Sequence, residues 1–150
     1  MSLSLEQQIL SEMLDRLKGP ALGPIGRPPD LAVERSRLRE LAHCQLPALS
    51  IYPLEAVTVR KGCLRETTLT VKVAIWAKST ASVPVDQELD PLWQWVHQQV
   101  VTDPSMGGLA QKVEPSQKIW GFALHQAPFG DLDLHYLITF KHHAENPTLP

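Results

Sequence analysis

Strict alternation of apolar and polar residues over long stretches is the feature that most constrains this fold. In residues 67–77 the alternating apolar positions are Leu69, Val71, Val73 and Ile75. In residues 132–140 they are Leu132, Leu134, Tyr136, Ile138 and Phe140. A period of two is the repeat of a β-strand, whose side chains point alternately to the two faces of a sheet. We therefore expect an antiparallel sheet with one buried face and one face partly in contact with water.

Shorter stretches with the same repeat complete the predicted sheet. They are LPALSIY at 46–52, a short segment at 57–60, and the alternating Trp120, Phe122 and Leu124. Glycine and charged residues in KGCLRE, at 61–66, predict the end of a hairpin, and PFGD at 128–131 predicts a turn. The chain should form about five strands in a mostly antiparallel or mixed sheet.

Helical patterns flank these strands. Ser4 followed by Gln7 is a capping box, which predicts the start of a first helix. Its apolar stripe is Leu5, Ile9, Met13 and Leu17, and Gly19-Pro20 ends the pattern. Residues 31–43 form a third, weaker pattern that could be a short charged helix.

The second main helix is predicted from Asp90-Pro91, read as an N-cap followed by proline at the first helical position. Its apolar stripe is Leu89, Leu92, Trp93, Val96 and Val100. A stripe of this width should lie on the sheet. The sequence thus predicts an α+β fold in which two main helices pack on one face of the sheet.

The length suits one domain spanning residues 1–150, because 150 residues with 43% hydrophobic content can bury a core of their own. Residues 19–29 read GPALGPIGRPP, and this density of glycine and proline predicts a flexible loop without helix or strand. Residues 143–150 are polar, contain two prolines and lack periodicity, which is typical of a disordered tail.

Charge and composition narrow the classes of partner. A formal net charge of -2 predicts no general attraction for nucleic acid or for anionic membrane surfaces. The N-terminal segment lacks the pattern of a signal peptide, and no stretch has the apolar length of a membrane span. With no export signal, Cys44 and Cys63 are expected to be free thiols in a reducing cytosol.

No motif predicts catalysis or nucleotide binding. In DPSMGGLAQKV, residues 103–113, Leu109 and Ala110 stand where a phosphate-binding loop has lysine and serine or threonine. His125, Asp133 and His135 could meet on one side of a hairpin, and such a set can bind zinc or iron. Polar residues on the wet side of any hairpin have the same pattern, however. We expect no cofactor and no enzymatic activity, and keep a small metal-dependent enzyme as an alternative.

Tryptophans and charged residues suggest an interaction surface instead. Trp93 and Trp120 lie on apolar stripes and are expected in the core, whereas Trp76 and Trp95 fall off them. The candidate interface residues are Trp76, Trp95, Met106, Arg60, Lys61 and Arg65. A further alternative is a module that binds a small ligand or peptide on the wet sheet face around Thr70, Lys72 and Trp76.

The order of these segments resembles a known family. LPALSIY, a hairpin, ETTLTVKVAIWAKS, VDQELDPLWQWVHQQV, DPSMGGLAQKV and the closing LDLHYLITFKH follow one another as in the tail terminator, or tail completion, proteins of long-tailed phages, of the lambda minor tail protein U type. The resemblance covers roughly residues 46–142. The Gly/Pro-rich segment at 19–29 and the longer tail depart from the lambda protein.

The resemblance implies a structural protein from a phage or prophage. Such proteins form hexameric rings that cap the tail tube, stop its polymerisation and provide the surface that joins the head. The implied partners are further copies of the chain, the major tail tube protein and head-tail connector proteins, and the implied location is the host bacterial cytoplasm and then the virion tail. The resemblance also implies that the glycines of DPSMGGL make a sharp turn with Leu109 as a packed anchor.

Overall fold

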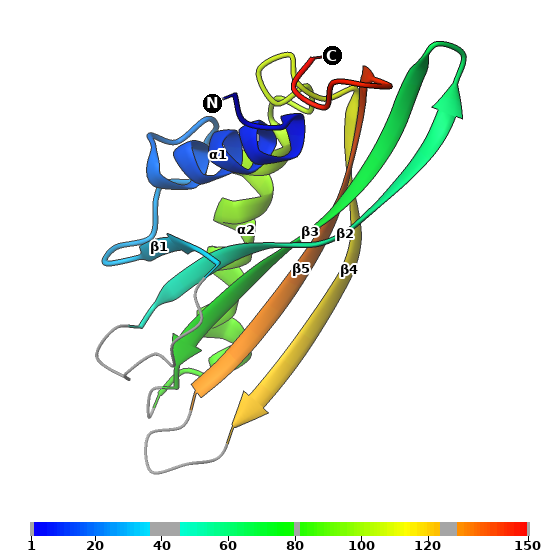
Figure 1. The fold of residues 1–150 in the computed structure, drawn as a ribbon. Coiled ribbons are helices and arrows are strands. Elements are labelled where there is room, and N and C mark those ends of the chain that lie inside the picture. The colour runs from blue at the N-terminus through cyan, green and yellow to red at the C-terminus, as the bar shows by residue number, and fades with distance from the viewer. Residues whose placement is uncertain (1, 37–45, 80–81, 124–128, 150) are drawn as a thin grey trace.

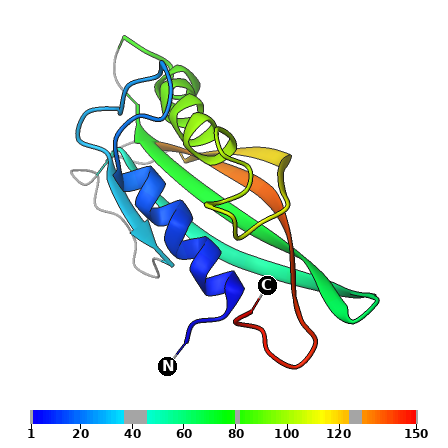
Figure 2. The same ribbon diagram turned by 90° about the horizontal axis from the view of Figure 1, so that it is seen from above.

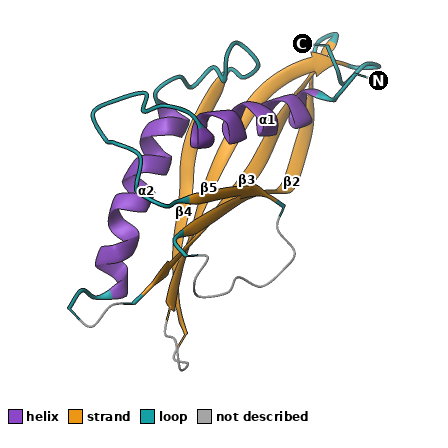
Figure 3. Cartoon of the chain, turned by 90° about the vertical axis from the view of Figure 1, so that its left-hand side faces the viewer, coloured by secondary structure: helices purple, strands orange, loops and turns teal. Residues whose placement is uncertain are grey.

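The protein folds into one five-stranded sheet with two helices on one of its faces (Figures 1 and 3). The computed structural model describes residues 2–36, 46–79, 82–123 and 129–149. The helices are α1 (Leu5–Lys18) and α2 (Val85–Val101). The strands are β1 (Ala32–Arg35), β2 (Ala48–Lys61), β3 (Leu64–Lys78), β4 (Lys112–Ala123) and β5 (Phe129–His143). This architecture confirms the predicted α+β class.

The strands are arranged in the order β1-β2-β3-β5-β4. All neighbouring pairs are antiparallel except β1 and β2, which are parallel, so the sheet is mixed. The long central pair, β3 and β5, stays in register from Leu64 opposite His143 to Lys78 opposite Phe129. Strands β1 and β4 are the two edges of the sheet.

Two predictions for the first half of the sheet were wrong. The expected strands at 46–52 and 57–60 are one strand, β2, which continues through an irregularity between Pro53 and Glu55. The weak helical pattern at 31–43 contains a strand at its start, because Ala32–Arg35 pairs with the first residues of β2. Residues 37–43 lie outside the described residues. A parallel pairing joins distant segments, so local periodicity does not indicate it.

Helix α1 begins as predicted. The Ser4 side chain accepts a hydrogen bond from the Gln7 amide at 3.3 Å, and the helix ends before Gly19. The buried apolar side chains of α1 include the four predicted ones. They face the sheet and α2, and Figure 2 shows the two helices side by side over the strands.

Helix α2 starts earlier than the sequence predicts. Its N-cap is Pro84, whose carbonyl accepts hydrogen bonds from the amides of Gln87 and Glu88. Pro91 therefore stands inside the helix rather than at its first position. Proline inside a helix leaves the carbonyl four residues earlier without its helical hydrogen bond, and the exposed position of Gln87 lets water reach that carbonyl. The prediction that Asp90 caps the helix was therefore wrong, because the helix already begins at Val85.

The core lies between the helices and one face of the sheet, here called the helix face. Its strand residues are those of the predicted alternation, and the side chains of Val71, Ile75, Leu132 and Ile138 are fully buried. The opposite side, the open face, bears Thr70, Lys72 and their neighbours, which are half-buried. The period of two in the sequence thus separates the two faces correctly.

The Gly/Pro-rich segment at 19–29 has no helix or strand, as predicted, but it is anchored to α2. Gln99 is fully buried, and its side chain accepts from the Leu22 amide at 2.9 Å and donates to the carbonyls of Arg16 at 2.7 Å and Pro20 at 3.0 Å. Gln98 accepts from the amide of Ile25 and donates to its carbonyl, both at 2.8 Å. These bonds join the segment to α2, and the flexibility expected from its composition stays a prediction.

The turn after α2 has the predicted glycine geometry. Gly107 and Gly108 have φ of 70° and 92°, a region that glycine adopts without strain. The Asp103 side chain accepts hydrogen bonds from Ser105 and from the Gly107 amide. The buried Arg16 side chain of α1 donates to Asp103 at 3.0 Å, which ties the turn to the helix. The hydrogen bonds from Ser105 and Gly107 lower the pKa of Asp103.

The C-terminal segment 144–149 is free of helix and strand but makes specific contacts. The Pro147 carbonyl accepts from the Leu5 amide and the Leu149 carbonyl accepts from the His143 amide, both at 2.9 Å. Asn146 caps the turn by accepting from Thr148. The segment therefore lies against the start of α1, near the end of β5 (Figure 1).

Candidate interaction surfaces

The first exposed surface is a two-stranded arm formed by residues 54–66, the upper ends of β2 and β3. The first residues of β2 are fully covered, whereas the strand is exposed from Pro53 onward. Figure 1 shows this hairpin extending past the helices, away from the body of the molecule. Leu54, Val57 and Val59 are 48%, 57% and 47% exposed, which is high for residues of this type.

The tip of the arm is basic. Arg60 and Lys61 are exposed and Arg65 is half-buried, around a tight turn at Gly62 and Cys63. Cys63 is exposed and free, whereas Cys44 lies outside the described residues. The arm therefore presents both apolar and cationic side chains. These three basic residues were interface candidates from the sequence, but the apolar residues beside them were not.

The second exposed surface is the lower half of edge strand β4, residues 117–122, here called the apolar edge. Trp120 is 46% exposed and Phe122 is 61% exposed, both on the helix face, and Ile119 is 44% exposed on the open face. The prediction that Trp120 belongs to the core was wrong. The apolar residues around Trp120 alternate as in a core strand, but β4 lies at the edge of the sheet, where α2 makes few contacts.

A cationic and aromatic cluster lies between α2 and the apolar edge. The Lys118 ammonium sits 3.4 Å from the centre of the Trp93 ring and 5.4 Å from that of Trp120. The His97 ring packs edge-on against Trp93 at 5.3 Å, and its Nδ1 is 3.3 Å from the Tyr136 hydroxyl. The side chains of Trp93, His97, Lys118 and Tyr136, but not that of Trp120, line part of a half-open cavity of about 320 Å³.

Burial controls the ionisation of this cluster. Burial, and then the charge of Lys118, lower the pKa of His97 below its ordinary value. Burial also lowers the pKa of Lys118, and the nearby Asp90 carboxylate opposes that effect. Burial raises the pKa of the Tyr136 hydroxyl. These shifts all favour the neutral forms of the His97 imidazole, the Lys118 amine and the Tyr136 phenol over their charged forms.

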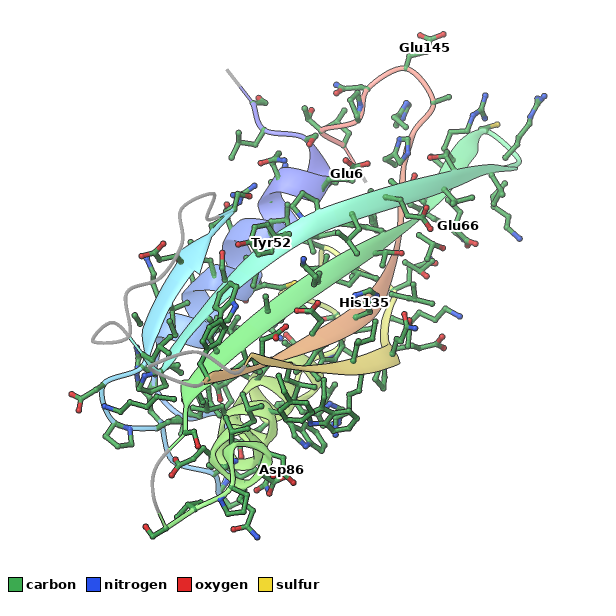
Figure 4. All side chains as sticks on the ribbon, turned by 90° about the horizontal axis from the view of Figure 1, so that it is seen from below. Glu6, Tyr52, Glu66, Asp86, His135 and Glu145 are labelled. Carbon is green, nitrogen blue, oxygen red and sulfur yellow. The ribbon has the colours of Figure 1, made fainter. Side chains whose placement is uncertain are left out.

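Acidic residues flank the apolar edge at the start of α2. Asp86 and Asp90 are exposed, and we call this pair the acidic rim. Figure 4 places Asp86 at one end of the molecule and Glu66, on the arm, at the other. The arm and the apolar edge are thus separate surfaces at opposite ends of one sheet, the first with a basic tip and the second with an acidic border.

The remaining interface candidates from the sequence differ in how exposed they are. Trp95 and Met106 are fully buried, so the prediction that they form an exposed surface was wrong. Trp95 belongs to the core cluster on the buried face of α2, which is wider than the predicted stripe. Met106 anchors the turn after α2, whereas Leu109, the expected anchor, is only partly buried. Trp76 is half-buried on the open face.

The candidate metal ligands form no visible cluster. Asp133 and His135 stand on the open face of β5, opposite Ala74 and Lys72 of β3. His125 lies outside the described residues, and within the described ranges no three histidine, cysteine or acidic side chains converge. Burial, and then the charge of Asp133, raise the pKa of Asp131.

The other alternative places a small ligand or peptide on the open face. There Lys72 lies 4.8 Å from the centre of the Tyr52 ring, so its ammonium already has an aromatic neighbour. Thr70 and Trp76 stand on the same face of β3. The half-open cavity described above lies instead between α2 and β4.

Comparisons with protein-family models and with curated proteins found no match for this chain. In the part of the chain that the structure describes, no helix has both the length and the apolar character needed to cross a membrane.

Proposed function

We propose that this protein is a structural assembly protein that forms a ring through contacts between identical copies. The observation that supports this most strongly is the pair of exposed surfaces, the arm and the apolar edge, at opposite ends of one sheet. Each has large apolar side chains that a monomer leaves in water, and their charged borders have opposite signs. Such residues are typical of sites where proteins meet.

Two different complementary surfaces favour a head-to-tail arrangement. In a symmetric dimer each copy presents the same patch, which must complement itself, whereas a head-to-tail contact joins one surface to another. Repetition of that contact closes a ring when the rotation between copies allows it. The position of the arm and the apolar edge at opposite ends of the sheet suits this second arrangement.

The specific ring that we propose is a phage tail terminator. The support for this step is the resemblance in the order of sequence segments, together with an α+β fold that has the two helices and the hairpins expected from it. In this role the ring would cap the tail tube, end its polymerisation and provide the surface that joins the head. Its partners would be the major tail tube protein and head-tail connector proteins, in the host cytoplasm and then in the virion tail.

The mass of the protein in solution tests the ring. We expect light scattering over a range of protein concentrations to give a defined oligomer, and negative-stain microscopy to show closed rings. Val57→Asp should abolish the oligomer without changing the circular dichroism, because it places a charge on the exposed apolar arm. Leu22→Asp is the matched control, since Leu22 is 42% exposed and lies outside both surfaces. A monomer at every concentration would contradict self-assembly.

The tube-capping step has its own test. The purified protein should shorten the tubes formed by a polymerising tail tube protein from the same phage, as measured by electron microscopy. Protein that forms rings but leaves tube length unchanged would refute the terminator role and leave the ring in place.

A further inference from the structure

We propose that the ring is held together by a strand-to-strand contact, in which the apolar edge of one copy, residues 117–122, pairs with the outer edge of the arm of the next copy, residues 54–61. The occupant of the apolar edge is therefore a second copy of this chain. This inference rests on the proposed ring and specifies its interface.

Both edges have backbone groups available for pairing. Strand β4 pairs with β5 on one side only, and β1 covers the outer side of β2 only from Ala48 to Ile51. Within the described residues nothing else pairs with 54–61 from outside or with 117–122. An exposed strand edge of this kind is a ready template for another strand.

Features of β4 direct the contact to its lower half. Pro115 has no amide hydrogen to donate, and the register of β4 shifts between Pro115 and Gln117. The segment before it also carries an exposed ion pair between Lys112 and Glu114 at 3.4 Å. Proline, a bulge and charges protect a sheet edge from pairing. The apolar edge has neither proline nor bulge, and its one charged residue, Lys118, lies against the Trp93 ring. On the arm the irregularity after Pro53 includes Leu54, and the register is regular from Glu55 to Lys61.

The direction of the strands suits an antiparallel contact. Along the order β2-β3-β5-β4 every neighbouring pair is antiparallel, so β4 runs opposite to β2. A second copy that continues the sheet with the same face toward its helices would place its β2 beside β4. The β2 strand of the second copy would then run antiparallel to β4. The second copy therefore needs no turn within the plane of the sheet to form this pairing.

The side chains also match on each face. On the open face the arm carries Val57 and Val59, and the apolar edge carries Ile119. On the helix face the arm carries Arg60, and the apolar edge carries Trp120 and Phe122. Pairing in the same orientation therefore puts aliphatic residues together on one face. In the register that places Arg60 opposite Trp120, a favourable cation–π pair, Val59 lies diagonal to Ile119 on the open face, and Lys118 and Phe122 lie diagonal to Arg60 on the helix face.

Charge complementarity favours the arm of another copy over a second apolar edge. In the antiparallel pairing the basic tip of the arm, with Arg60 and Lys61, would approach Asp90, whose carboxylate lies near Lys118. A symmetric contact between two apolar edges would instead bring two acidic rims together. Opposite charges at the borders guide association and disfavour the wrong pairing.

Cysteine cross-linking tests the contact in the full chain. In a background with Cys44→Ser and Cys63→Ser, one preparation carries Val59→Cys and a second carries Ile119→Cys. A short bismaleimide added to the mixture should give a cross-linked pair, and each preparation alone should not. The control mixes Leu22→Cys with Ile119→Cys, which should give no product. The rings of each preparation are checked first by light scattering, so that only assembled protein is compared.

The outcomes separate this inference from the proposed function. Rings that give no cross-link between Val59→Cys and Ile119→Cys would overturn the strand contact but leave the ring intact. Cross-linking of the Ile119→Cys preparation alone would indicate a symmetric contact and would also overturn it. If the unmodified protein formed no oligomer at any concentration, the proposed ring itself would be refuted.

An arginine substitution provides a second measure. Arg60→Ala should raise the dissociation constant between copies about tenfold, as expected for a well-placed arginine in an interface. Lys18→Ala, an exposed cation at the end of α1, should leave it unchanged. Equal dissociation constants for Arg60→Ala and the unmodified protein would contradict the cation–π contact.

Discussion

Replacement of Gln99 by leucine should detach the Gly/Pro-rich loop from α2 and destabilise the protein. The side chain of Gln99 is fully buried and makes four hydrogen bonds. Three of them join α2 to the end of α1 and to the loop that follows, and the fourth is accepted from Gln98 at 3.4 Å. Leucine has a similar volume but no polar atom. Gln99→Leu therefore removes the hydrogen bonds with little change in packing.

The expected loss follows from the partners that remain. A buried amide hydrogen bond contributes about 1 kcal/mol net, and a buried group left without a partner costs about 1–3 kcal/mol. Leu22 and Pro20 are exposed, so water can replace the bonds to their backbone groups. The Arg16 carbonyl keeps a hydrogen bond from the Gly19 amide at 3.3 Å. We therefore expect a loss of about 2 kcal/mol, toward the lower end of the range for three lost bonds.

Urea unfolding followed by circular dichroism measures this loss. About 2 kcal/mol should lower the melting temperature of a chain of this size by roughly 4–8 °C. The matched control is Gln94→Leu, because Gln94 is exposed on the same helix and donates only to Asp90. It should change stability by less than about 0.5 kcal/mol. Equal stabilities of the two variants would refute the view that Gln99 anchors the loop. All proteins are compared at one concentration, since assembly adds to apparent stability.

Four further predictions concern ionisation, backbone geometry and the hydrogen bonds of the turn after α2. Lys118→Gln should raise the pKa of His97 in an NMR titration, because it removes a nearby positive charge; an unchanged or lower pKa would argue against that electrostatic coupling. The pKa of His97 is lower in the folded protein than in the unfolded chain, so below about pH 6.5 the unfolded chain binds more protons. His97 should therefore lower the free energy of unfolding as the pH falls from about 6.5 to its folded pKa. Urea unfolding at several pH values would detect this loss, and His97→Gln should reduce it. Gly108→Ala should lower the free energy of unfolding by about 1 kcal/mol, because Gly108 has a positive φ that alanine adopts only with strain. Gly26→Ala should be nearly neutral, because Gly26 has similar open space around it and no such φ. Equal effects of the two substitutions would contradict the explanation from backbone strain. Asp103→Ala should lower the free energy of unfolding by about 1–2 kcal/mol, because it removes the acceptor that organises the turn. Asp103→Asn should lower it less, because asparagine keeps an acceptor oxygen. The reverse order in thermal melts would show that the charge of Asp103 matters more than its hydrogen bonds.

Local signals in the sequence were sufficient for the features that depend on local geometry. The cap at Ser4, the alternation along β3 and β5 and the positive φ of the glycines after α2 all follow from the conformations that single residues or short repeats allow. Features that depend on distant segments were missed. Strand β1 pairs in parallel with β2, and Gln98 and Gln99 hold a loop more than seventy residues away in the chain.

The candidate surfaces show the same limit. The residues of the arm tip were found because a hairpin end carrying three basic residues is visible in the sequence. Trp95 was misplaced because the buried face of α2 is wider than its apolar stripe, and Trp120 because its exposure depends on β4 being an edge strand. Strand order is not encoded in the period of any one strand. Exposed aromatic residues at 120 and 122 could have been found only from that order.

The change of β2 from a covered start to an exposed end should also be visible in its dynamics. Residues Ala48–Ile51 are packed under α1 and beside β1, whereas residues 54–61 have a partner strand on one side only. Amide hydrogen exchange should therefore be slow at the base of this single strand and progressively faster toward the tip, as expected where opening requires less of the core to separate. Docking of the arm on a neighbour would remove that gradient, so exchange at the tip would report assembly residue by residue.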